Sequence, residues 1–208
     1  MTRAHFTALA AVSLPVLAAC SGGGIAMTDA DQHYIDLFNQ TTELQANYPG
    51  TGSSLTPISQ IPVSGTGVAY NGTTVLNVGS GGAVASLLGE TELKVNFTND
   101  TFGGRMTNFV GTEGGAPATD YTGTLIVSGG SLDVTRGYVL QSNLNGSLTS
   151  GSDSVFVNGI LLGNFHERSG MTGTADAALF NLASGSVINY NGVGHPGSGL
   201  SAIGERDN

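Results

Sequence analysis

The stretch that decides the fold is Thr91–Val110, with the sequence TELKVNFTNDTFGGRMTNFV. Apolar and polar residues alternate on both sides of Asn99-Asp100, a pair that favours a two-residue hairpin turn. A turn at this pair sets Thr98 opposite Thr101, Phe97 opposite Phe102, Val95 opposite Gly104 and Leu93 opposite Met106. Every apolar residue of these pairs then falls on one face. The pattern therefore predicts an antiparallel β-hairpin with one buried face.

The other face of this hairpin is polar and carries Glu92, Lys94, Asn96, Arg105 and Thr107. In this register Lys94 lies opposite Arg105, which is mildly unfavourable, so a wider loop with a β-bulge remains an alternative. A barrel that crosses a membrane presents an apolar belt to the lipid, and this face has none. We therefore expect strands that do not span a bilayer.

Strand-like alternation continues beyond the hairpin, in residues 121–127, 132–134, 138–140, 144–148, 155–165 and 171–180. Turn signals recur about every ten residues, which is typical of a sandwich or a barrel and gives roughly eight or nine strands. The faces expected to point inward mix glycine with bulky side chains, as the tapering interior of a small closed barrel requires. We therefore predict an all-β fold, a single eight-stranded antiparallel up-and-down β-barrel with a filled lumen.

The N-terminus has the composition of an export signal and ends at the only cysteine of the chain, Cys20. Arg3 supplies a positive charge, and an apolar core runs from about residue 6 to residue 16. This core is too short for a spanning helix, which needs about 20 apolar residues. The run Leu17-Ala18-Ala19-Cys20 resembles the lipobox of bacterial lipoproteins. The resemblance implies cleavage before Cys20, diacylation of its thiol and attachment to a membrane by lipid.

The alternative for this segment is an ordinary signal peptide that is cut near Ala19 and leaves Cys20 as a free thiol. With no second cysteine there is no intramolecular disulfide, and an exposed thiol is a liability in an oxidising compartment. The diacylglycerol of a lipoprotein supplies two acyl chains, which is enough for stable anchoring. We therefore expect Cys20 to be a lipid attachment site.

The pattern along the chain predicts four parts. Residues 29–46 form the one helical pattern, with Thr28 as N-cap and acidic residues in the first turn. The apolar stripe of this helix predicts packing on the end or the flank of the barrel. The parts are a signal peptide (1–19), a lipidated tether with the short helix (20–64), the barrel (65–190) and a flexible C-terminal tail (191–208).

The composition limits the classes of partner. The chain of 208 residues has a formal net charge of −9, 33 glycines and only 10% charged residues. A chain this acidic repels phosphate backbones, so we expect no binding of nucleic acid. It also lacks a basic patch that would hold anionic lipid headgroups. The glycines follow no Gly-X-Y period, which excludes a collagen-like fold.

No motif for catalysis or metal binding stands out, and His33, His166 and His195 lie far apart in the sequence. We interpret His166-Glu167-Arg168 as a solvated hairpin turn, with a partner-binding tip as the functional alternative. Residues 192–197 match Gly-x-Gly-x-x-Gly, but no helix can follow them, so they belong to the predicted tail. We therefore predict a protein that is not an enzyme and that has no cofactor or metal site.

Two segments of the predicted barrel carry a family resemblance. Residues 93–104, LKVNFTNDTFGG, are similar to a hairpin of the form apolar-x-Val-Asp-Phe-x-x-x-Thr-Phe/Leu-x-Gly. Residues 157–165, VNGILLGNF, with Gly170 and residues 173–175 after them, resemble a later Gly-x-Phe-Tyr-Gly hairpin. Both hairpins resemble the β-barrel domain of transferrin-binding protein B and its smaller relatives, which include factor H-binding lipoproteins and haem- or haemophilin-type proteins.

The chain departs from that family at several places. Asn96 stands where the family has Asp, and Phe165-His166-Glu167-Arg168 stands where it often has Phe-Tyr-Gly-Pro. The handle domain that grips transferrin has no evident counterpart, although residues 29–62 are a candidate remnant. The resemblance implies the fold and a surface lipoprotein, with a dedicated outer-membrane translocator in some members, and it transfers no binding residues.

Three hypotheses for the function follow. The first is a non-enzymatic binding protein, lipid-anchored at the bacterial outer membrane and facing the cell surface or the periplasm, that presents its barrel to a host or secreted protein or to a haem- or iron-related ligand. The second is a periplasm-facing, lipocalin-like carrier whose lumen holds a small apolar ligand. The third is a hydrolase built on the barrel, for which Asp153, Glu167 and Asp176 are the candidate carboxylates.

Overall fold

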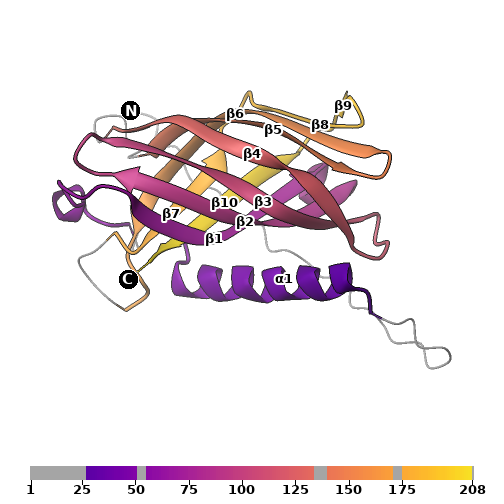
Figure 1. Ribbon diagram of the computed structural model, residues 1–208, viewed down its shortest axis with the longest axis horizontal. Helices are drawn as coiled ribbons and strands as arrows, with labels where there is room; N and C mark the ends of the chain where they lie inside the picture. Colours follow the sequence, from indigo (N-terminus) through magenta and orange to yellow (C-terminus); the bar gives the residue numbers. More distant parts are fainter. Residues whose placement is uncertain (1–26, 51–54, 134–139, 171–174, 208) are drawn as a thin grey trace.

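The computed structural model describes residues 27–50, 55–133, 140–170 and 175–207. These residues contain ten β-strands in a single sheet and an α-helix near the N-terminus. Eight of the strands close into an antiparallel barrel in the order β1-β2-β3-β4-β5-β6-β7-β10, and β10 returns to β1 (Figure 1). The predicted eight-stranded barrel with a helix before it is therefore confirmed.

The elements have the following bounds. The helices are α1 (Asp29–Asn47) and two short 3-10 turns, η2 (Ile58–Gln60) and η3 (Ser80–Gly82). The strands are β1 (Val68–Val78), β2 (Ala85–Asn96), β3 (Thr101–Glu113), β4 (Thr119–Leu132), β5 (Leu140–Ser150), β6 (Asp153–His166), β7 (Ala177–Leu182), β8 (Val187–Tyr190), β9 (Val193–Gly194) and β10 (Gly199–Arg206).

The β2–β3 hairpin forms where it was predicted, but the predicted register is wrong by two residues because the loop is wider and spans residues 97–100. Side chains alternate between faces with a period of two, so this shift leaves the residues up to Met106 on their predicted faces. Beyond Met106 an irregularity in the register exchanges the faces, so that Phe109 points into the lumen and Val110 packs beneath α1. It moves Lys94 away from Arg105 and sets Glu92 opposite Arg105 instead. Glu92 Oε2 lies 2.7 Å from Arg105 Nη2, so a repulsive pair becomes an ion pair.

Aromatic and aliphatic side chains fill the lumen, as the pattern predicted. The centre of the Phe165 ring lies 5.6 Å from that of Tyr70 and 5.4 Å from that of Phe97. Phe102 and Phe180 form a second pair with centres 5.6 Å apart. All five rings are buried within one continuous hydrophobic core.

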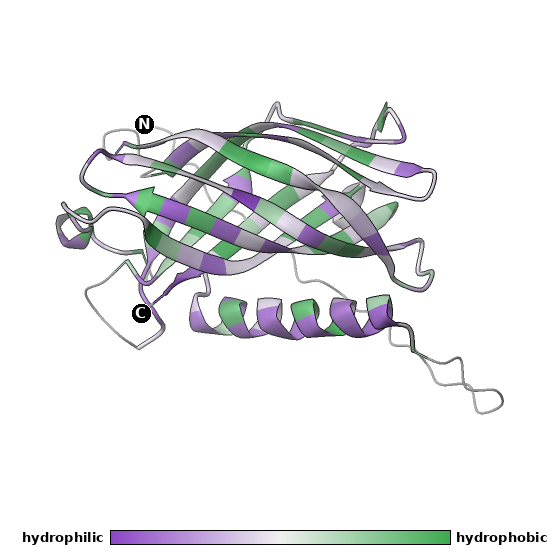
Figure 2. Ribbon diagram, viewed as in Figure 1, coloured by the Kyte–Doolittle hydropathy of each residue, from purple (hydrophilic) through white to green (hydrophobic). Residues whose placement is uncertain are grey.

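Helix α1 lies along the outside of the barrel (Figures 1 and 2). It begins with the predicted cap: the Thr28 hydroxyl accepts from the Asp31 N–H, and the Asp31 carboxylate accepts from the Thr28 N–H. Its buried face packs on outward-facing side chains of the barrel, in two clusters. The first joins Tyr34 and Leu37 to Val75, Leu88, Val110 and Ala118, and the second joins Leu44 and Tyr48 to Ala177, Leu179 and Ile203.

The C-terminal residues do not form the predicted flexible tail. Gly199–Arg206 is β10, which pairs with β1 on one side and with β7 on the other. Leu200 and Ala202 point into the lumen, whereas Ile203 is buried beneath α1. The eighth strand of the barrel therefore lies beyond residue 190, outside the predicted barrel bounds. Its edges are paired by β1 and β7 and its faces are buried by the lumen and by α1, so the interactions that form it come from distant parts of the chain.

One end of the barrel is covered by the segment between α1 and β1. The Thr56 N–H donates to the Phe165 carbonyl at 3.0 Å, Leu55 forms a bridge with His166, and Ile61 joins the core. His166 and Glu167 are consequently buried, so their interpretation as a solvated turn is wrong. Burial lowers the pKa of His166 to about 4.

Candidate functional site

Most of the residues named by sequence lie apart in the structure. Cys20 lies outside the described residues. His33 is on α1, where its Nδ1 lies 3.8 Å from Asp120 Oδ1, and His195 follows β9. Asp153 begins β6 and Glu167 follows its other end, so these two carboxylates lie at opposite ends of the barrel.

The described residues give two further observations. Among them, no three His, Cys, Asp or Glu side chains come close enough together to hold a metal ion. No helix in the described ranges is long and apolar enough to cross a bilayer.

The wall of the barrel is interrupted where β7 ends. Strand β6 pairs with β7 up to Leu182 and then with β8 from Val187, and the four residues between them bulge out opposite Gly159 and Ile160. The bulge is held by two bonds, from the Ala183 N–H to the Ile160 carbonyl at 2.7 Å and from the Ile160 N–H to Ser186 Oγ at 3.2 Å. Strands β7 and β8 therefore both pair with β6, one after the other, and the bulge separates them.

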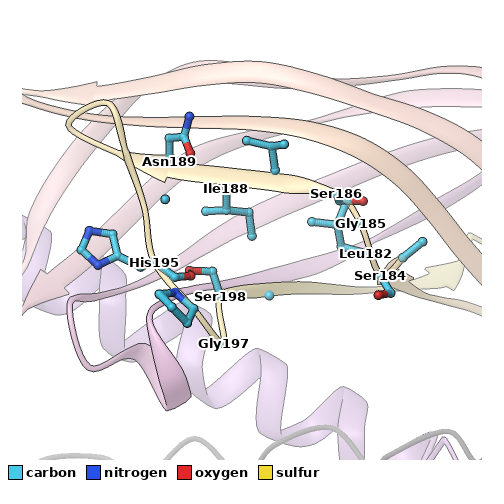
Figure 3. A pocket seen from close by; sticks show the side chains of 14 residues that line it. Leu182, Ser184, Gly185, Ser186, Ile188, Asn189, His195, Gly197 and Ser198 are labelled. Atoms are coloured by element: carbon cyan, nitrogen blue, oxygen red, sulfur yellow. The ribbon is translucent and has the colours of Figure 1, made fainter.

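A pocket opens beside this interruption, which we name the slot. One wall is residues 182–189 and the other is residues 194–199, which include most of the Gly-x-Gly-x-x-Gly match. Figure 3 shows Ile188 and Asn189 on the first wall and Gly197 and Ser198 on the second. The volume of about 530 Å³ lies within the usual range of small-ligand sites, about 300–1,000 Å³.

The walls of the slot are uncharged apart from the titratable ring of His195. The Ser198 hydroxyl is engaged within the fold, because it donates to the His195 carbonyl at 2.7 Å and accepts from the Gly79 N–H at 2.9 Å. For the Ser184 hydroxyl and the Asn189 amide, no partner is found among the described residues. These two side chains are available to a bound molecule.

Two tyrosines and two carboxylates lie at the same end of the barrel as the slot. The Tyr121 hydroxyl donates to Glu113, and Asn191 Nδ2 donates to Asp153 Oδ1 at 2.8 Å. Burial, with Glu113 as a further cause, raises the pKa of both Tyr121 and Tyr190. Both phenols stay protonated and act as donors, and the carboxylates make this end of the barrel repel anions.

The second feature is an uncharged surface on the side of the barrel away from α1, which we name the neutral face (Figure 1). It consists of the outward-facing side chains of β4, β5, β6 and β8. They are Thr122, Thr124, Ile126, Ser128, Gln141, Asn143, Asn145, Ser147, Thr149, Ser154, Phe156, Asn158, Ile160, Leu162, Val187 and Asn189. The outward sides of β2 and β3, in contrast, carry Glu90, Glu92, Lys94 and Arg105.

Strand register arranges the neutral face in rows that lead to the slot. Ile126 pairs with Asn145, Asn145 with Asn158, and Asn158 with Val187 at the edge of the slot. Ile126 is 47% exposed and Val187 43% exposed, and Phe156 in the next row is 37% exposed. Apolar and amide side chains thus share one surface.

Comparison with protein-family models, with curated proteins and with solved structures finds no match for this chain. The assignment of a function therefore depends on the neutral face, the slot and the N-terminal sequence.

Sequence reasoning missed both surface features. The absence of charge was visible, since residues 121–166 contain only Asp133, Arg136 and Asp153 as charged residues. The sequence alone does not show that these uncharged residues form one surface, because that depends on the register of four strands. The slot had no comparable signal, because it depends on an interruption in the pairing of β6.

Proposed function

We propose that the protein is a non-enzymatic binding protein, anchored at the bacterial outer membrane by lipid on Cys20, whose neutral face binds a host or secreted protein. The observation that carries this proposal is the neutral face on a chain with a net charge of −9. Charged groups are costly to remove from water, and the centres of protein interfaces are depleted in them. Amide and hydroxyl side chains around an exposed aromatic ring are also the chemistry of antibody binding surfaces.

A protein partner fits these surfaces better than haem does. Haem carries two propionates, which proteins usually pair with Lys or Arg. No Lys or Arg lies on the neutral face or lines the slot, and the carboxylates of Glu113 and Asp153 are nearby. A haem- or iron-related ligand is therefore the less favoured form of the proposal.

The test uses isosteric changes that add charge. The full chain with Cys20→Ser is used as soluble bait in host serum, alone and with Asn145→Asp and Asn158→Asp. We expect the two added carboxylates to reduce capture of the partner about tenfold, since each must be desolvated in the interface. A variant with Asn39→Asp and Gln40→Glu, on the exposed side of α1, adds the same charge and should bind as the parent does.

The result that would overturn the proposal is equal capture by the parent, by the variant of the neutral face and by the α1 control. Binding of haem by the parent, seen as a Soret shift, would instead support the haem form. Protease treatment of intact cells tells the two membrane faces apart, because only a surface-displayed barrel is digested.

A second function, as a carrier of a small apolar ligand, is favoured by the slot. Its volume suits such a ligand, and Leu182 and Ile188 supply apolar side chains. The pocket lies in the wall, however, and the lumen is filled, so a carrier would bind in the slot rather than in the lumen. An apolar fluorescent probe that binds the parent and is lost from Gly199→Phe would support this function; no binding would exclude it.

A further inference from the structure

Two strand edges without partners face the slot. Strands β7 and β10 are paired up to Asn181 and Ser201, and β8 pairs with β9 only at its last two residues. On the slot side of Val187 and Ile188, no strand in the described part of the chain forms a pair. Unpaired strand edges bind extended chains by main-chain hydrogen bonds.

The pairing of β8 shows which main-chain groups reach the slot. The Asn191 N–H donates to the Ser154 carbonyl, on the β6 side, at 2.8 Å. Successive residues of a strand direct their N–H and C=O groups to opposite sides, so Tyr190 and Ile188 face away from β6. Tyr190 is paired with Val193, whereas Ile188 lies beyond the end of β9. The N–H and C=O of Ile188 therefore point into the slot.

The same reasoning applies to the opposite edge. The Arg206 N–H donates to the Asp176 carbonyl on the β7 side at 2.7 Å, so alternation directs Leu200 to that side as well. The Ala183 N–H donates to β6, so Leu182 faces β10. Leu182 and Leu200 would be the next pair of the β7–β10 ladder, but that pair is not formed. Both present main-chain groups to the slot.

The charges and polar groups around these edges indicate which kind of bound segment the slot favours. The walls are uncharged apart from His195, and the nearby carboxylates Glu113 and Asp153 disfavour an acidic segment. The side chains of Ser184 and Asn189 offer further hydrogen bonds at the rim. A small sugar would bind the Ser184 and Asn189 side chains equally well but would leave the main-chain groups of the strand edges unpaired. An extended peptide can bind the side chains and the strand edges together.

We propose that the slot binds an uncharged, extended segment of a partner protein, which adds as a strand against β8 and β10. This inference rests on the proposed function, since it takes the partner to be a protein, and it names the place and form of the contact. The neutral face reaches the slot through Val187 and Asn189, so one partner covers both.

The test selects linear heptapeptides from a random library on the full chain with Cys20→Ser. We expect enriched peptides to lack Asp and Glu and to lose affinity at least about tenfold on Gly199→Phe, which fills the slot. Gly199→Ala is the matched control, because a Cβ at Gly199 meets nothing within 4 Å. It should bind like the parent.

Two measurements keep the test independent of how well Gly199→Phe folds. N-methylation of the selected peptide at alternate residues removes main-chain donors and should abolish binding, and peptide saturation should slow hydrogen exchange at the Ile188 and Leu200 amides about tenfold. Binding that survives N-methylation, or unchanged exchange at both amides, would overturn the inference. The proposed function would stand if the variant of the neutral face still lost its partner.

Discussion

Gly163 illustrates how closely the barrel interior is packed. A Cβ at this position would lie 2.4 Å from the Leu179 carbonyl oxygen and 2.6 Å from a carbon of the Phe180 ring. The backbone contact cannot be relieved by a rotamer change, so we expect Gly163→Ala to lower the free energy of unfolding by about 1–3 kcal/mol. Urea denaturation followed by circular dichroism measures this, and stability equal to that of the parent would contradict the close approach. Gly199→Ala, in open space, should leave stability within about 0.5 kcal/mol.

Because His166 is buried, we expect the stability of the protein to depend on pH. Burial lowers its pKa to about 4 in the folded protein, whereas in the unfolded chain it is about 6.5. Between these values the unfolded chain binds a proton that the folded protein does not. The contribution of His166 is therefore fully present above pH 6.5, falls as the pH decreases toward 4, and is constant below that.

The measurement compares the parent with His166→Gln. We expect the free energy of unfolding of the parent to lose up to about 1.4 kcal/mol more per pH unit across this window than that of the variant. The comparison removes the effect of the carboxylates, which titrate in both proteins. Parallel curves for the two proteins would show that His166 takes up its proton equally easily when folded.

At the scale of elements, the sequence predicted which face of a strand a side chain occupies better than which residue lies opposite it on the next strand. In the β2–β3 hairpin the alternation placed the side chains up to Met106 on the correct face, yet the register was wrong by two, because a shift by the period of the pattern leaves the faces unchanged. The charges held the missing information: only the wider loop sets Glu92 opposite Arg105. In α1 the cap and the buried stripe were both local features, so both were predicted.

Strand β10 was missed because its evidence is not local. Its residues follow a stretch rich in Gly, with Pro196, and its inward positions include Gly204, so the alternation is weak. The burial of His166 and Glu167 was missed for a similar reason, since the covering segment lies about a hundred residues away in the sequence. The slot needs both β8 and β10 in place, so no reading of either segment alone predicts it.

The role of β10 is tested by a chain that ends at Ser198. We expect this chain to lose cooperative unfolding and to be digested rapidly by protease, because β1 and β7 lose their common neighbour and Ile203 leaves the cluster beneath α1. A chain that ends at Asp207 keeps β10 and serves as the control. A cooperative transition in the shorter chain, with the midpoint of the control, would show that the barrel closes without its last strand.

The whole molecule divides its charge between its two sides. The helix and strands β2 and β3 carry charged groups outward, whereas the outward side chains of β4, β5, β6 and β8 carry none apart from Asp120 near α1. A filled barrel is a rigid support, so binding on the neutral face or in the slot requires little ordering of the scaffold. Such a module works at a membrane only if something holds it there, and Cys20 is the candidate.

The lipid anchor is tested by Cys20→Ser. We expect the variant to be exported and to move from the membrane fraction to the soluble fraction, because removal of the thiol prevents acylation and the attachment depends on acyl chains. Fractionation followed by immunoblotting measures this, with palmitate labelling of the parent as the direct check on Cys20. The barrel should fold unchanged, since the described residues that fill its lumen begin at Ile61 and α1 begins at Asp29, both after Cys20. A Cys20→Ser protein that stays with the membrane after a carbonate wash, together with an unlabelled parent, would show that another part of the chain holds the bilayer.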